Sequence, residues 1–171
     1  MKKRVVGVIP SRWGSTRFPG KSLALIGGRP LLAWVVERAQ PARRLDEVWV
    51  ATDDERIAAA ARTFGATVAM TSPAHPSGTG RIAEAVRSRE ADVVVNIQGD
   101  EPLIDPGLID QVAEVLASRT DLDMATAATP LSCAEELHNP DIVKVVRDLD
   151  GRALYFSRSV IPCVRGAETN F

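Results

Sequence analysis

The sequence has few cysteines and almost no net charge. Its 171 residues include two cysteines, Cys133 and Cys163, which have neither CxxC nor metal-ligand spacing. Free thiols in a reducing compartment are the simplest interpretation, and one buried disulfide stays open as the alternative. The formal net charge of −1 gives no electrostatic reason to expect a nucleic-acid partner. Any anion-binding site must therefore be local.

Long apolar runs are also lacking. No stretch approaches the roughly 20 apolar residues that cross a bilayer. The basic start Met1–Arg4 is followed by an apolar run that ends at Pro10, which is too short for an export signal. We therefore expect a cytoplasmic protein without membrane insertion. Hydrophobic content of 45% and charged content of 25% predict one globular domain over residues 1–171.

Strand-length apolar runs alternate with helix-length segments along the chain. Strands are predicted at Val5–Ile9, Glu47–Ala51, Thr67–Met70, Asp92–Ile97 and Met124–Ala128. Helices are predicted at Pro30–Ala39, at Glu55–Thr63 with Asp53 as the N-cap, at Arg81–Arg87 and from Pro106 onward. Residues 142–147 and 152–156 predict a β-hairpin. The pattern indicates an α/β fold with a mostly parallel sheet flanked by helices and a hairpin near the C-terminus.

A thirteen-residue stretch, Ile9–Lys21, dominates the functional interpretation. It follows the first predicted strand and carries three cations, Arg12, Arg17 and Lys21, together with two glycines. Fixed positive charges among small residues suit a polyphosphate, because cations supply charge and glycine lets backbone N–H groups approach. The alternative is a solvated surface loop, although loops of this length in compact domains are usually functional or disordered.

The end of this stretch is not a P-loop. That motif requires four residues between its glycine and its Gly-Lys pair, whereas five residues separate Gly14 from Gly20. Pro19 also removes a backbone N–H where a P-loop uses such donors. What remains is a nucleotide site that relies on side-chain cations.

An acidic segment, Gln98–Pro102, follows the fourth predicted strand. In the common strand order 3-2-1-4, the first and fourth strands are neighbours, so this segment and the cationic loop would meet at the switch point. A polyphosphate with a divalent metal needs such a pairing, and Asp100 is the candidate Mg²⁺ ligand. The alternatives are a turn-forming role for Asp100 and simple ion pairing for Glu101.

Five motifs together resemble one enzyme family. They are Pro10–Lys21, Ala51-Thr-Asp-Asp54, His75-x-Ser-Gly-Thr79, Asn96-x-Gln-Gly-Asp-Glu-Pro102 and Ala153-Leu-Tyr-Phe-Ser-Arg158. Over essentially the whole chain they resemble the 3-deoxy-manno-octulosonate cytidylyltransferases, also called CMP-KDO synthetases. The resemblance implies a Rossmann-like nucleotidyltransferase that uses Mg²⁺ to convert CTP and KDO into CMP-KDO and pyrophosphate for lipopolysaccharide synthesis.

The resemblance also implies residue roles. The CTP-binding set would be Ser11, Arg12, Ser15, Arg17, Lys21, Ser77 and Gly78. Lys21, Arg12 and Asp100 would be catalytic, with Asp100 also the metal ligand. Gln98 and Arg158 would bind the sugar, with a surface salt bridge as the alternative for Arg158. Helix capping by Thr79 is the alternative explanation of the Ser77–Thr79 segment.

The family's chains continue past the position of Phe171. By resemblance, that part carries a second metal-binding aspartate, further sugar contacts and much of a homodimer interface. A 171-residue product would then keep the CTP half of the site and lack the complete KDO half. Two alternatives stay open: transfer of CMP to another acidic sugar such as a sialic acid, and a nucleotide-binding domain without catalysis.

Overall fold

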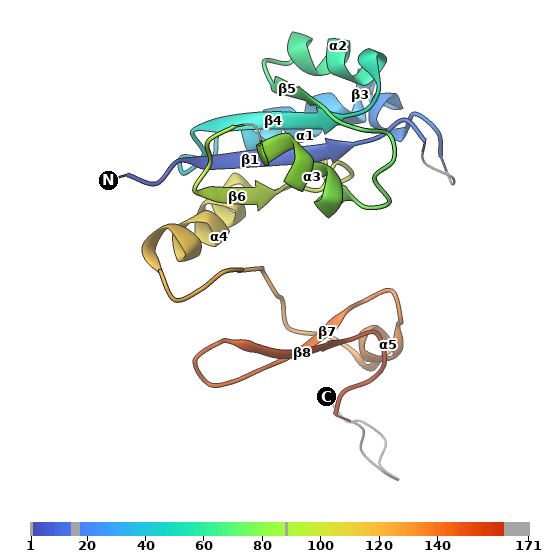
Figure 1. Cartoon of the computed structure of the whole chain (residues 1–171). Helices are drawn as coiled ribbons and strands as arrows, with labels where there is room; N and C mark the ends of the chain where they lie inside the picture. The colour runs from blue at the N-terminus through green and yellow to red at the C-terminus, as the bar shows by residue number, and fades with distance from the viewer. Residues whose placement is uncertain (1, 15–17, 88, 163–171) are drawn as a thin grey trace. The chain divides into compact units, whose positions relative to one another are not determined.

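The computed structural model describes residues 2–14, 18–87 and 89–162 (Figure 1). The chain divides into two compact units, Met1–Thr126 and Ala127–Phe171, which we call unit 1 and unit 2. A single domain over residues 1–171 stays a prediction. Cys133 is a free, partly buried thiol, whereas Cys163 lies outside the described residues.

Unit 1 is built on a four-stranded parallel sheet. Its strands are β1 (Val5–Ser11), β4 (Glu47–Thr52), β5 (Thr67–Met70) and β6 (Val93–Asn96). The spatial order is β5-β4-β1-β6, so β1 is central and Val8 lies opposite both Trp49 and Asn96. This is the predicted order 3-2-1-4, and it places the first and fourth strands of the sheet side by side (Figure 1).

Helices cover both faces of this sheet. They are α1 (Leu31–Ala39), α2 (Glu55–Thr63), α3 (Gly78–Arg87) and α4 (Pro106–Ser118). Along β1, Val5 and Ile9 join a buried cluster that contains side chains of α1, α2 and α4. The alternate residues Val6 and Val8 join a second cluster with α3. The two-residue period of a strand thus sends successive side chains into two cores, which explains the near-continuous apolar sequence of β1.

The helix ends follow local side-chain chemistry, with one correction. The prediction that Asp53 caps α2 is wrong, because Asp54 has the extended backbone of an N-cap and accepts from Arg56 N at 2.9 Å. At α4, Asp105 accepts from Gly107 N at 2.9 Å and Pro106 occupies the first turn. Asp53 is therefore free to bond elsewhere.

A short 3₁₀ helix, η1 (Lys21–Leu23), and a two-stranded ladder, β2 (Leu25–Ile26) with β3 (Arg29–Pro30), connect the long loop to α1. Pro30 precedes α1 as its N-cap.

The predicted strand at Met124–Ala128 is wrong. That segment has no ladder partner among the described residues, and Met124 is 85% exposed, so neither pairing nor burial supports a strand there.

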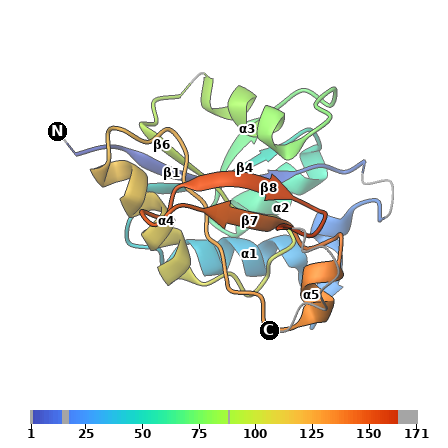
Figure 2. The ribbon, with the colours of Figure 1, turned by 90° about the horizontal axis from the view of Figure 1, so that it is seen from below.

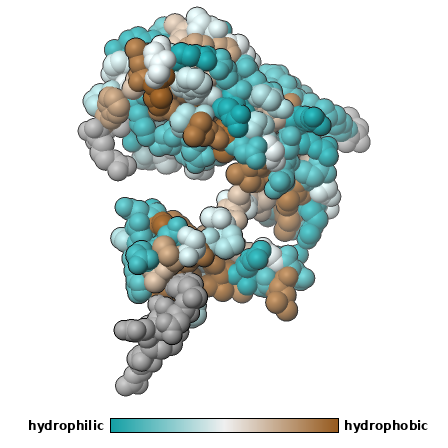
Figure 3. All heavy atoms as spheres, turned by 180° about the vertical axis from the view of Figure 1, so that it is seen from behind, coloured by the Kyte–Doolittle hydropathy of each residue, from teal (hydrophilic) through white to brown (hydrophobic). Residues whose placement is uncertain are grey.

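Unit 2 contains α5 (Ala134–His138) and the antiparallel pair β7 (Lys144–Arg147) and β8 (Ala153–Ser157), which confirms the predicted hairpin (Figures 1 and 2). Several of its apolar side chains are exposed, including Leu154 and Tyr155, and brown patches mark apolar residues on its surface (Figure 3). Within the described residues, none of the helices has both the length and the apolar character needed to span a membrane.

Candidate functional site

Hydrogen bonds join the beginning of the loop between β1 and η1 to its end. The buried hydroxyl of Ser11 donates to Ser22 Oγ at 2.6 Å, which joins the last residue of β1 to the second residue of η1. Gly20 has φ of 68° and donates its N–H to the Trp13 carbonyl at 3.0 Å. A side chain is disfavoured at this φ, and a Cβ here would also lie 2.9 Å from the Trp13 ring. The described parts of the loop therefore have a defined conformation.

Lys21 and Asp100 meet at the carboxyl edge of the sheet. Lys21 Nζ lies 2.7 Å from Asp100 Oδ2, although the two residues are 79 positions apart in sequence. The pairing arises because β1 and β6 are parallel neighbours, so the segments that follow them end side by side. The side chains are 43% and 54% exposed. An exposed pair contributes only about 0–1 kcal/mol, so an incoming anion and cation can replace it at little cost.

Two glycines let the neighbouring loops approach β1 closely. A Cβ on Gly99 would lie 3.1 Å from the Pro10 carbonyl oxygen, and one on Gly78 would lie 3.2 Å from Pro10 Cγ. Both distances are shorter than most contacts that real Cβ atoms make, with a backbone oxygen in the first case and a ring carbon in the second. The start of α3 and the segment after β6 thus both pack against the carboxyl end of β1, where Lys21 and Asp100 lie. Two of the segments that carry predicted site residues therefore lie against Pro10.

Ser77 and His75 have local partners before α3. Ser77 Oγ accepts from Gly80 N at 3.1 Å, so Ser77 caps this helix and the alternative of a cap at Thr79 is wrong. His75 is partly buried, and its Nε2 pairs with Glu84 Oε2. This hydrogen bond, together with the Ser72 N–H at 2.9 Å from the same oxygen, lowers the pKa of Glu84.

The remaining predicted site residues differ in exposure and in the unit to which they belong, and two of them are not described. Arg12 and Gln98 are exposed. Arg12 lies in the loop after β1, and Gln98 lies two residues beyond the end of β6. Arg158 belongs to unit 2, where its Nη1 donates to the Pro140 carbonyl at 2.8 Å. Ser15 and Arg17 lie outside the described residues.

Sequence reasoning missed a buried polar group beside the loop. Arg81 on α3 has a side chain only 2% exposed, and its guanidinium pairs with Asp53 Oδ2 at 2.9 Å. The other Asp53 oxygen accepts from Trp13 N at 3.4 Å. No local pattern signals this group, because its members come from three separate segments of the chain.

Metal ligands are sparse at this edge. Among residues 2–14, 18–87 and 89–162, no three His, Cys, Asp or Glu side chains are arranged to hold a metal ion. Asp100 is one exposed carboxylate. Mg²⁺ bound to a nucleotide commonly takes one or two carboxylates, with phosphate oxygens and waters filling the other positions. The donor set therefore fits a metal that arrives with a triphosphate.

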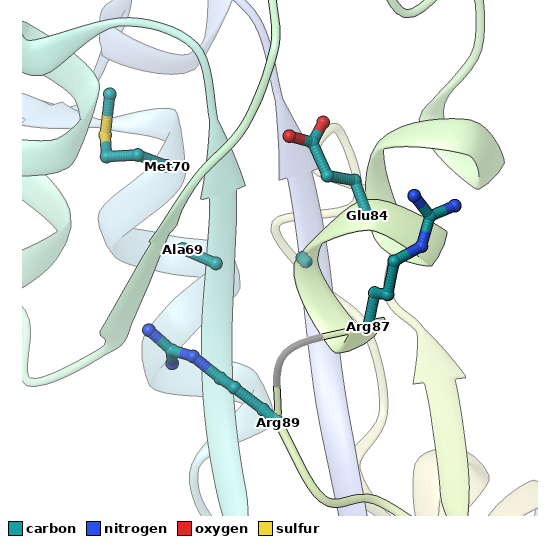
Figure 4. Close-up of a pocket in the computed structure, with 6 residues that line it drawn as sticks. Ala69, Met70, Glu84, Arg87 and Arg89 are labelled. Atoms are coloured by element: carbon teal, nitrogen blue, oxygen red, sulfur yellow. The ribbon is translucent and has the colours of Figure 1, made fainter.

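A separate hollow of about 360 Å³ lies between β5 and α3 (Figure 4). Its lining includes Met70, Glu84, Arg87 and Arg89 and none of the predicted site residues. Arg89 is already committed, because it donates to the Val68 carbonyl at 2.9 Å and its guanidinium stacks on Trp49. This hollow is not part of the candidate site.

Comparisons with known proteins agree with the geometry. The cytidylyltransferase family model matches residues 6–171. A 3-deoxy-manno-octulosonate cytidylyltransferase of Chromohalobacter salexigens is 53% identical over 161 residues, covering 92% of this chain and 62% of that protein. The protein of that name from Geotalea daltonii is 48% identical over 162 residues, covering 95% of this chain and 64% of its own.

A solved CMP:2-keto-3-deoxy-manno-octonic acid synthetase complexed with CTP has a TM-score of 0.85 and 41% identity, covering 95% of this chain and 67% of that one. This chain spans a little under two thirds of the length of the two curated relatives. Family match, identity and shared fold lead to one conclusion: the chain belongs to the cytidylyltransferase family, among the 3-deoxy-manno-octulosonate cytidylyltransferases.

Proposed function

We propose that this protein transfers CMP from CTP to KDO, releasing pyrophosphate, as a step of lipopolysaccharide synthesis. The observation that carries the proposal is the contact of Lys21 with Asp100 at 2.7 Å, which joins a cationic loop to an acidic segment at the sheet edge. Two supporting facts are the names of the curated relatives and the CTP in the solved neighbour. A cytoplasmic location and a homodimer of the full-length protein belong to the same proposal.

The cationic side chains bind the triphosphate. In our proposal Lys21 acts as a compact charge at the α-phosphate, and the planar guanidinium of Arg12 donates to the outer phosphates together with Arg17 and Ser15. The Ser11 hydroxyl donates to Ser22, so Ser11 holds the start of the loop in place and contributes only backbone atoms to CTP binding. Ser77 and Gly78, at the start of α3, contact the nucleotide on its base side.

Asp100 holds Mg²⁺ when CTP is bound. Bound there, the metal would supply positive charge that offsets the phosphates. Asp100 is suited to this role because its carboxylate is exposed and its present partner, Lys21, is an exposed surface charge. Lys21 is released from Asp100 in the same exchange and becomes free to contact phosphate oxygens.

The reaction forms one P–O bond and breaks another. A hydroxyl oxygen of KDO attacks the α-phosphorus, the bond from this phosphorus to the bridging oxygen breaks, and pyrophosphate leaves with the electron pair. The hydroxyl proton passes to solvent. Lys21 and Arg12 are fixed donors beside the oxygens on which charge grows, and losing one such donor typically lowers the rate by about 10²–10³-fold.

Gln98 and Arg158 bind the sugar acid in this proposal. Gln98 follows β6 on the same segment as Asp100, and its amide can donate to and accept from sugar hydroxyls. Arg158 has a forked guanidinium that suits a carboxylate. CMP transfer to a sialic acid and nucleotide binding without turnover are the alternatives, the latter because the chain spans less than two thirds of its curated relatives.

Pyrophosphate release tests the activity directly. We expect purified protein with CTP, Mg²⁺ and KDO to release pyrophosphate, and the same mixture with sialic acid in place of KDO to release none. Release with sialic acid but not with KDO would contradict the assignment of KDO as the substrate. CTP binding by calorimetry without release from either sugar would contradict catalysis by this chain.

Lys21→Ala should lower kcat/KM by about 10²–10³-fold while the melting temperature stays near that of the wild type, because the side chain is exposed and its charge acts on the phosphates. Lys2→Ala is the matched control, since Lys2 also pairs with a carboxylate at 2.7 Å on the surface. A steady-state assay of both variants decides, and equal rates for the two would remove Lys21 from the mechanism.

Asp100→Asn should shift the Mg²⁺ dependence of the rate to higher concentration, because an amide oxygen is a weaker ligand for a hard cation than a carboxylate. The control is Asp121→Asn, which alters an equally exposed carboxylate that pairs with Arg119. Mg²⁺ titrations of the three proteins give the answer. Superimposable curves for Asp100→Asn and the wild type would exclude the ligand role.

A further inference from the structure

The buried pair Asp53–Arg81 joins segments that follow different strands. Asp53 comes directly after β4, and Arg81 lies in α3, which packs on the sheet through the second core cluster. Besides Asp53, the guanidinium donates through Nη1 to Thr71 Oγ1 at 2.5 Å. The exposed fractions of the Arg81 and Asp53 side chains are 2% and 12%. Both charges are therefore largely withdrawn from water.

Such a pair is a poor source of stability. Desolvating two charges offsets most of their attraction, and replacing a buried pair with apolar residues of similar volume is often neutral or stabilising. Breaking it by removing one partner, in contrast, leaves an uncompensated charge. What the pair holds in place is therefore of more interest than its contribution to the free energy of folding.

The Asp53 carboxylate holds the loop that carries the cations. While Oδ2 pairs with Arg81, Oδ1 accepts a long hydrogen bond from Trp13 N at 3.4 Å. The carbonyl of Trp13 in turn accepts from Gly20 N at 3.0 Å. Trp13 follows Arg12 directly, and Gly20 directly precedes Lys21. The contacts thus run from α3 to the backbone beside both cations.

The Trp13 side chain adds to this attachment. Its ring lies against Gly20, and the Arg56 guanidinium stacks on it with 3.2 Å between Cζ and the ring centroid. Arg56 is itself oriented by two hydrogen bonds to the Asp54 carboxylate, at 2.9 and 2.7 Å, and this hydrogen bonding lowers the pKa of Asp54. Backbone and ring of Trp13 are therefore both fixed by the segment after β4.

We propose that Asp53, which is paired with Arg81, is a positioning residue that fixes Trp13 and so sets the places of Arg12 and Lys21 for the triphosphate. Neither side chain need touch CTP, because Asp53 acts through the backbone of the loop and Arg81 acts through Asp53. The inference rests on the proposed function, since it assumes that this loop binds CTP. It adds that nucleotide affinity depends on the side-chain oxygen that residue 53, directly after β4, offers to Trp13 N. Displacing a binding group by about 1 Å can change rates 10²-fold, so such a support has functional weight.

Two double variants separate the loop contact from the ion pair. Asp53→Asn/Arg81→Met removes both charges and keeps a side-chain oxygen for Trp13 N, whereas Asp53→Leu/Arg81→Met removes that oxygen as well. Removing the acceptor of a backbone N–H typically changes a dissociation constant by roughly 10-fold. We expect the leucine variant to bind CTP about 10-fold or more weakly than the wild type and the asparagine variant to stay within about 3-fold of it. Calorimetry with CTP, alongside melting curves, measures this.

Equal CTP affinity of the folded leucine variant and the wild type would overturn the inference, as would an equal loss in both double variants. If the wild type itself binds no CTP, the proposed function fails instead, and the two failures are distinguishable. If the leucine variant does not melt cooperatively, hydrogen exchange of the wild-type protein is the deciding measurement. The Trp13 and Gly20 amides should exchange at least about 10-fold more slowly than in an unstructured peptide. Exchange at the peptide rate would overturn the inference.

Discussion

The parallel pairing of β1 with β4 on one side and β6 on the other is the constraint on which the candidate site depends. Parallel strands end at the same edge, so the segments after β1, β4 and β6 meet there although they are far apart in the chain. Gly78 and Gly99 permit the close approach to Pro10 that this convergence requires. Without the β1–β6 ladder nothing would bring Lys21 and Asp100 within 2.7 Å of each other.

Two ion pairs at this edge have opposite physical characters. Lys21–Asp100 is exposed, contributes little to stability and can be exchanged for phosphate and metal. Asp53–Arg81 is buried and bonded on several sides, so it cannot be exchanged cheaply. The exposed pair is suited to contact a ligand, whereas the buried pair is suited to hold the loop behind it in place. In our proposal, side-chain cations held by such a support take the place of the tight backbone nest on which a P-loop relies.

Apolar periodicity was sufficient to predict the four sheet strands and, through general topology rules, their order. It failed at Met124–Ala128, because an apolar pentapeptide becomes a strand only where a neighbour pairs with it. It also missed β2 and β3, whose two residues each are too few to show a period. At the site, motifs indicated Lys21 and Asp100, but the choice of Asp54 over Asp53 as the helix cap depends on tertiary contacts. The partner of Asp53 lies 28 residues away on another element, and no local pattern encodes that distance.

A crystal structure of the protein with CTP and Mg²⁺ would test the central claim most directly. The account predicts triphosphate oxygens within hydrogen-bonding distance of Lys21 Nζ, Asp100 turned away from Lys21 toward the metal, and the Asp53–Arg81 pair unchanged. CTP bound at another edge of the sheet, or a Lys21–Asp100 contact that survives nucleotide binding, would contradict it.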